Sequence, residues 1–78
     1  MIGYHVTTPS KLAQYRQTGA ILPPVRFWPT YDTAQAWARK TGRSLILRMD
    51  CEVHYPLPDH RPAHWTPEII RHFEEAQS

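Results

Sequence analysis

A histidine and a threonine lie two residues apart in a short apolar run next to the N-terminus, Tyr4-His5-Val6-Thr7-Thr8. Alternate residues of a β-strand point to the same face, so a strand here would place His5 and Thr7 together. An imidazole beside a hydroxyl can bind a polar ligand or transfer a proton. The pair is the main indication of function in the sequence. The alternative is a half-buried strand histidine that is hydrogen-bonded to a backbone carbonyl.

A second group of side chains that could bind a metal ion lies in the second half of the chain: Cys51, His54, His60 and His64. One thiol and three imidazoles would suit tetrahedral zinc, which could stabilise a small core. The spacing matches no standard zinc module, and prolines separate the histidines. The alternative is a polar surface loop stiffened by proline.

The positive charge is concentrated in the first part of the chain. Residues 1–48 contain seven of the nine Lys and Arg residues and only one acidic residue, Asp32. Seven of the nine cations are Arg, whose forked guanidinium group suits phosphate. This distribution predicts a basic surface for a phosphate-bearing ligand or nucleic acid. The alternative is attraction between a basic half and an acidic half of the fold.

The pattern of apolar residues and helix caps predicts one small α+β (or small α/β) domain over 1–78, with three or four strands. Thr8-Pro9 and Gly19 are typical of the two ends of a helix. A second helix begins near Thr30 or Asp32, with an expected capping pair of Asp32 and Gln35. The predicted order is strand, helix, strand, helix, strand over 2–7, 9–18, 25–28, 30–41 and 44–49.

The last third of the chain has a different character. Three prolines predict an open Pro/His-rich loop over 50–65. Thr66-Pro67-Glu68 again resembles a helix start, which predicts a C-terminal helix over 66–78 with a staple between Trp65 and Ile70. This helix would fold back on the sheet or dock on a partner, either another protein or a second copy in a homodimer.

Cys51 is the only cysteine, so the chain contains no internal disulfide. No apolar run is long enough for a signal-peptide core or a membrane span. We therefore expect a cytoplasmic location and no membrane partner.

Two segments resemble the ADP-ribosyltransferase-like fold. Tyr4-His5-Val6-Thr7-Thr8 is similar to the His-x-Thr strand of bacterial DNA-targeting ADP-ribosyltransferases and RNA 2′-phosphotransferases. Phe27-Trp28-Pro29-Thr30, followed by Ala34-Gln35-Ala36-Trp37-Ala38, is similar to the strand end and helix that come next in that family. The resemblance covers about residues 4–38, which would be the N-terminal half of the fold.

The resemblance implies an NAD site with His5 as the candidate catalytic residue, bonded to a ribose hydroxyl. Its aromatic walls would be Phe27, or Trp28 with a register slip, and Trp37. The remaining implied ligand-binding residues are Tyr4, Thr7, Arg26 and Arg43, where either arginine could meet the pyrophosphate. The alternative role of Trp28 and Trp37 is to anchor the core.

The family also carries a Glu on a later strand, and the sequence predicts none there, since Glu68, Glu74 and Glu75 fall in the expected C-terminal helix. The predicted function is therefore a minimal module that binds a nucleotide, NAD or a nucleic-acid end without catalysis of its own. If it is active, the activity would resemble ADP-ribosyl transfer or 2′-phosphotransfer. The alternative is a small basic regulatory module of phage or toxin–antitoxin type that binds nucleic acid or protein, with or without zinc.

Overall fold

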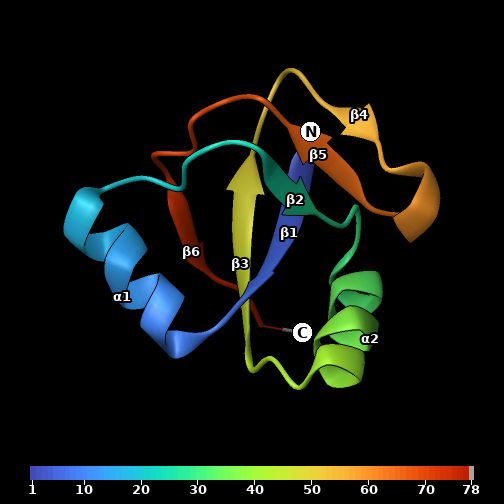
Figure 1. The fold of residues 1–78 in the computed structure, drawn as a ribbon, viewed down its shortest axis with the longest axis horizontal. Coiled ribbons are helices and arrows are strands. Elements are labelled where there is room, and N and C mark those ends of the chain that lie inside the picture. Colours follow the sequence, from blue (N-terminus) through green and yellow to red (C-terminus); the bar gives the residue numbers. More distant parts are fainter. Residues whose placement is uncertain (78) are drawn as a thin grey trace.

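The computed structural model describes residues 1–77, which form an α+β fold of two helices and six strands (Figure 1). The first antiparallel sheet has the order β1 (Ile2–Thr7), β3 (Leu45–Asp50) and β6 (Phe73–Glu75). The second has the order β2 (Val25–Phe27), β5 (His64–Thr66) and β4 (Tyr55–Pro56). The helices are α1 (Pro9–Thr18) and α2 (Tyr31–Thr41), with a 3₁₀ turn at Pro58–His60.

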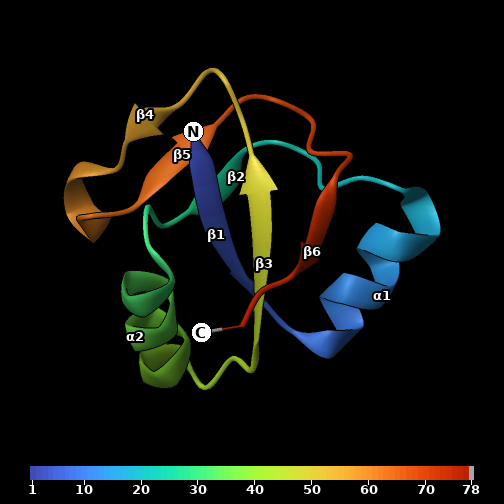
Figure 2. The same cartoon turned by 180° about the vertical axis from the view of Figure 1, so that it is seen from behind.

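Two backbone bridges join the sheets. Tyr4 and Trp28 exchange hydrogen bonds of 2.9 and 2.8 Å between β1 and the residue that follows β2. Ile21 and Ile70 do the same at 2.8 and 3.0 Å between the loop before β2 and the segment before β6. Figure 2 shows the first sheet from behind, with α1 and α2 on opposite sides of it. Strand β2 starts at Val25 and lies at a sheet edge, since Pro23 and Pro24 before it have no N–H to donate to a neighbouring strand.

The first helix has the predicted ends. The Thr8 side chain accepts from the backbone N–H of Lys11, and Gly19 adopts the left-handed conformation, φ 78°. The second helix is capped by Thr30, whose hydroxyl accepts from the N–H of Thr33, so the predicted pair of Asp32 and Gln35 is wrong. Within residues 1–77, no helix has the length and apolar character needed to cross a membrane.

The core consists of two groups of buried side chains, one against each face of the first sheet, since Leu47 belongs to one group and the adjacent Ile46 to the other. Phe27 and Leu47, both fully buried, lie at the centre of the first, and Trp28 and Ala34 belong to the second. Phe27 lies directly against Gly3, where a Cβ atom would collide with its ring. The aromatic side chains of β2 and its continuation therefore serve as structural anchors.

The predicted C-terminal helix is wrong: residues 66–77 contain the end of β5 and strand β6. Thr66 donates to the carbonyl of Val53 and accepts from the N–H of Glu68, so it forms a turn. The Glu68 carboxylate accepts from the N–H groups of Glu52 and Val53. Tertiary hydrogen bonds thus override the local helix signal, and the expected helical docking surface is absent from these residues.

The predicted loop over 50–65 is more ordered than expected. It contains β4, the 3₁₀ turn and the first residues of β5. Strand β5 pairs with β4 on one side and with β2 on the other. The N–H of Leu57 donates to the carbonyl of Ala63, and that of Ala63 to His60, at 2.9 and 2.7 Å. Trp65, expected to pack on Ile70, packs on Tyr55 with ring centroids 5.1 Å apart.

Candidate functional site

A hollow of about 460 Å³ opens between α1, β1, β2 and the loop that follows α2. Figure 1 shows α1 on one side of the view and α2 on the other, with β1 and β2 between them. We call this concavity the cationic hollow. Its walls are made by His5, Val6, Lys11, Gln14, Tyr15, Thr18, residues 20–22, Pro24, Arg26, Trp28 and Arg43. Its size is within the usual range of a small-molecule site.

Three cations from three different elements meet at this hollow. Lys11 comes from α1, Arg26 from β2 and Arg43 from the loop after α2. No lining residue is acidic, and within residues 1–77 none of the three forms an ion pair. Cations that lack protein counter-ions and share one concavity attract an anion. The structure therefore gathers part of the charge that the sequence concentrates in 1–48.

His5 lines the hollow and is half-buried. Its Nδ1 lies 2.6 Å from the carbonyl oxygen of Arg26, and its Nε2 lies 3.2 Å from the hydroxyl of Tyr15. A carbonyl oxygen only accepts, so Nδ1 carries the proton and Nε2 accepts from Tyr15 in the neutral ring. His5 is therefore bonded to a backbone carbonyl, as the alternative expects, and it also borders a cavity.

Burial lowers the pKa of His5 below its ordinary 6.5, and the positive charges of Lys11, Arg43 and Arg26 lower this pKa further. The hydrogen bond to the Arg26 carbonyl opposes these effects. The ring is therefore neutral at pH 7 and serves as a hydrogen-bonding group of a cationic site.

An NMR titration of the histidine ring protons should give His5 a midpoint below 6.5. Because the unfolded chain takes up this proton at a higher pH than the folded protein, the free energy of unfolding should fall as pH drops below about 6.5. His5→Asn keeps a donor for the Arg26 carbonyl and should make this decline shallower. A midpoint at or above 6.5 would contradict the buried, cation-flanked environment.

Two other predicted ligand-binding residues of the first strand, Thr7 and Tyr4, do not line the hollow with His5. Thr7 is 1% exposed, so its hydroxyl is not presented to a ligand beside the imidazole as the alternation predicts. Tyr4 is half-buried and packs edge-on against Tyr31, with centroids 6.1 Å apart. Burial contradicts the predicted ligand contact of Thr7, and Tyr4 lies outside the lining of the cationic hollow.

The predicted aromatic residues separate into three environments. Phe27 is fully buried and stacks on His64, so it is not a ligand wall. Trp28 lines the cationic hollow with the small part of its ring that is exposed. Trp37 stacks on Trp28 with centroids 5.4 Å apart, and it borders another concavity with Lys40. The indole pair is thus mainly a core anchor, and only Trp28 reaches the hollow.

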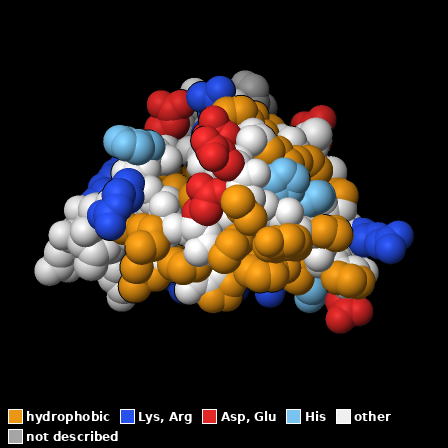
Figure 3. Space-filling model, turned by 90° about the horizontal axis from the view of Figure 1, so that it is seen from above, with side chains coloured by type: hydrophobic (Ala, Val, Ile, Leu, Met, Phe, Trp, Pro, Cys, Tyr) orange, Lys and Arg blue, Asp and Glu red, His pale blue; other side chains and the backbone are white. Residues whose placement is uncertain are grey.

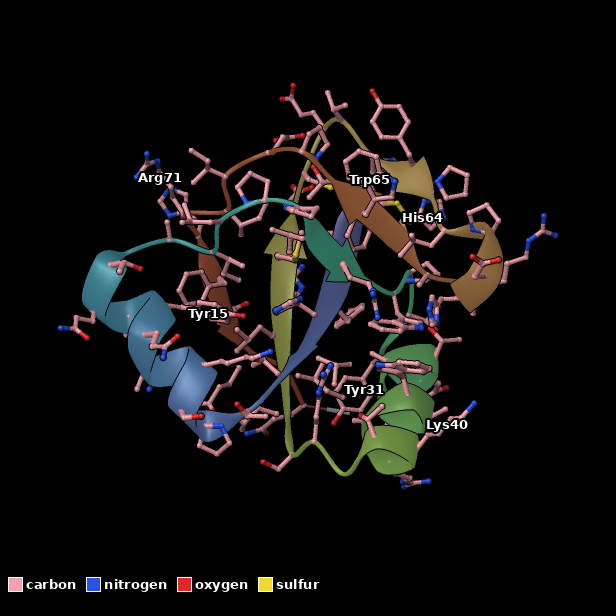
Figure 4. All side chains as sticks on the ribbon, viewed as in Figure 1. Tyr15, Tyr31, Lys40, His64, Trp65 and Arg71 are labelled. Atoms are coloured by element: carbon pink, nitrogen blue, oxygen red, sulfur yellow. The ribbon has the colours of Figure 1, made fainter. Side chains whose placement is uncertain are left out.

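Among the lining residues that were not singled out from the sequence, Lys11 and Tyr15 contribute most to the site. Lys11 and Tyr15 are four residues apart on α1, so they project from one side of that helix. Tyr15 packs edge-on against Phe73, and its hydroxyl reaches His5. Figure 4 shows this ring directed from α1 toward the sheet. The four-residue spacing of Lys11 and Tyr15 in the predicted helix could have indicated that they share one side of it.

The candidate zinc ligands are only partly brought together. His54 and His64 lie side by side, with their Nδ1 atoms 3.2 Å apart. Cys51 is buried in the first core group, and His60 packs edge-on against Trp37. In the described part of the chain, no group of three or more His, Cys, Asp or Glu side chains is arranged to hold a metal ion.

Two glutamates lie on a strand, which corrects their expected place in a helix. Pairing across the first sheet aligns His5, Leu47 and Glu75 in one row, so Glu75 is two strands from His5 on the same side. The buried Leu47 separates them, and Glu75 pairs with Arg16 at 3.2 Å. Glu74 pairs with Arg48 at the same distance. Neither carboxylate lines the cationic hollow.

Comparisons of this chain with family models, with curated proteins and with solved structures found no match.

Proposed function

We propose that the cationic hollow binds the phosphate groups of a nucleotide, either free, as in ADP, ADP-ribose or NAD, or at the end of a nucleic acid. The single observation that carries this proposal is the convergence of Lys11, Arg26 and Arg43 on one concavity without an acidic lining residue. Arginine binds phosphate oxygens through paired N–H donors, and lysine adds a mobile positive charge.

The neutral groups of the hollow complete a site for such a ligand. The edge of Trp28 supplies apolar surface, and Gln14 and Thr18 add hydrogen-bonding side chains from α1. His5 and Tyr15 are already bonded to each other, which fixes both rings at the wall. The resemblance of the N-terminal segments to ADP-ribosyltransferases agrees with this ligand class and makes NAD the first dinucleotide to test. The proposed activity is binding rather than catalysis.

Calorimetric titration with ADP tests the proposal. Arg43→Gln should weaken ADP binding by about 10-fold or more, since it removes a hydrogen bond between charged partners. Arg39→Gln is the matched control: Arg39 is exposed on α2, it carries the same charge, and it does not line the hollow. NAD and ADP-ribose titrations then identify the preferred member of the class. Failure of the unchanged protein to bind ADP at millimolar concentration, or equal weakening by both variants, would overturn the proposal.

A further inference from the structure

The second sheet carries an arginine, a tryptophan and a tyrosine in one row across its three strands. Arg26 on β2 is paired with Trp65 on β5, and Trp65 is paired with Tyr55 on β4. Directly paired residues project to the same side of a sheet, so the three side chains are neighbours. Two strand spacings make the row about 10 Å long. We call it the stacking row.

The stacking row lies on the solvent side of the sheet. Arg26 and Tyr55 are exposed and Trp65 is half-buried, whereas their strand neighbours Val25 and Phe27 are buried. Figure 4 shows Trp65 on β5 beside β4. The phenol and indole rings lie 5.1 Å apart and tilted by 38°, so they form a joint aromatic surface. Seen from above, hydrophobic side chains gather in a patch along one side of the molecule (Figure 3).

This surface is continuous with the cationic hollow. A mostly apolar depression of about 380 Å³ is lined by Pro24, Arg26, Leu57 and Trp65. Pro24 and Arg26 also line the cationic hollow, so the two concavities share a wall. A ligand that crosses Pro24 and Arg26 can therefore place phosphate among the cations and flat apolar groups on the rings.

We propose that the stacking row and the cationic hollow together bind single-stranded nucleic acid, with backbone phosphate in the hollow and unpaired bases on Trp65 and Tyr55. This inference rests on the proposed function, because the hollow supplies the phosphate contacts. Stacking on aromatic rings beside a basic groove is the usual means of binding single strands without sequence preference. Arg26 stands between the two parts, where a guanidinium group can contact phosphate and stack on a base.

The composition of the surface favours a nucleic acid over a protein partner. A partner that covered Trp65 and Tyr55 would also cover Arg26, which has no ion-pair partner in residues 1–77. Covering an unpaired arginine with apolar protein surface is costly. A nucleic acid provides the missing negative charge and the flat apolar surface in one ligand.

The test uses the full chain and a labelled single-stranded DNA of mixed sequence, about eight nucleotides long, which is a usual site size for such surfaces. Fluorescence anisotropy should show that Trp65→Leu lowers affinity by about 10-fold or more, and that Tyr55→Leu lowers it by a smaller factor. Trp65→Phe keeps a stacking ring and should retain most of the affinity. Leucine preserves apolar contact, so the pair of Trp65 variants separates stacking from packing.

Two further measurements distinguish this inference from the function on which it rests. Pyrophosphate binding, followed by calorimetry, should be the same in Trp65→Leu and the unchanged protein. The slope of log affinity against log salt should decrease by about 0.7 in Arg43→Gln and stay constant in Trp65→Leu. An RNA of the same sequence then shows whether the 2′-hydroxyl contributes.

The outcomes are clearly separated. If pyrophosphate binds but Trp65→Leu and Trp65→Phe bind DNA as well as the unchanged protein does, the stacking row is not a base platform and the proposed function stands. If pyrophosphate does not bind, the proposed function fails. A concentration-dependent dimer that Trp65→Leu dissociates in sedimentation would overturn the stacking row as a nucleic-acid site and assign it to self-association.

Discussion

Replacement of Phe27 by alanine is expected to lower the free energy of unfolding by about 3–5 kcal/mol. The ring is fully buried, it lies against Gly3, and it stacks on His64. A domain of this size has a total stability of about 4–12 kcal/mol, so the loss is a large part of the whole. Urea unfolding followed by circular dichroism measures this loss. The slope of the free energy of unfolding against urea concentration should stay unchanged, which shows that the variant loses stability without a change in the surface exposed on unfolding.

Tyr55→Ala is the matched control, because Tyr55 is an aromatic residue on the same sheet but 48% exposed. It should change the free energy of unfolding by about 0.5 kcal/mol or less. The two variants together distinguish a core ring from a surface ring. If Phe27→Ala retained its stability and instead lost ADP binding, the ring would be the ligand wall that the resemblance implies.

Local signals in the sequence were sufficient for the first part of the fold. Thr8 and Pro9 define the start of α1, and Gly19 its end, through backbone groups that lie within one or two turns. The strand predicted over 44–49 is confirmed as β3, in which Ile46 and Leu47 are both buried although they point to opposite faces. Helix caps of this kind depend on hydrogen bonds between residues close in sequence, so they can be predicted without knowledge of the rest of the chain.

The C-terminal strands were not predictable in this way. Thr66-Pro67-Glu68 has the residues of a helix cap, but Thr66 and Glu68 satisfy backbone groups of the distant segment around Val53. Ile70 then pairs with Ile21, and Phe73 with Met49 at the open side of β3. These partners are separated in sequence by more than ten residues, and no single-sequence pattern indicates that they meet.

The charge of the candidate site was predictable in part. The concentration of cations in 1–48 indicates a basic surface, and the resemblance implies that Arg26 or Arg43 contacts pyrophosphate. Both arginines line one hollow with His5. The assignment of Phe27 failed because a three-residue strand has too little alternation to show which side is buried. The pairing of Trp65 with Tyr55 was missed because it requires strands β4 and β5. The sequence predicted a loop over 50–65 and a helix from 66, so neither strand was expected.

The largest functional effect is expected when Arg26 and Arg43 are both replaced by glutamine. Two charge-assisted contacts to phosphate are lost at once, which should weaken ADP binding by about 100-fold or more. The same charges lower the pKa of His5, so the double variant should also raise this pKa toward 6.5. The hydrogen bond from His5 to residue 26 uses its backbone carbonyl, which the substitution keeps.

Two readouts on one variant show why the affinity is lost. Calorimetry gives the affinity for ADP, and an NMR titration gives the midpoint of His5 in the same sample. Bound phosphate should raise the pKa of His5 in the unchanged protein, because a negative charge near the ring favours its protonated form. By linkage, ADP should then bind more tightly as the pH is lowered from 8 toward 6. If the double variant lost ADP binding while the His5 midpoint stayed constant, the two arginines would not share the hollow with this ring, and the geometry on which the proposed site depends would be wrong.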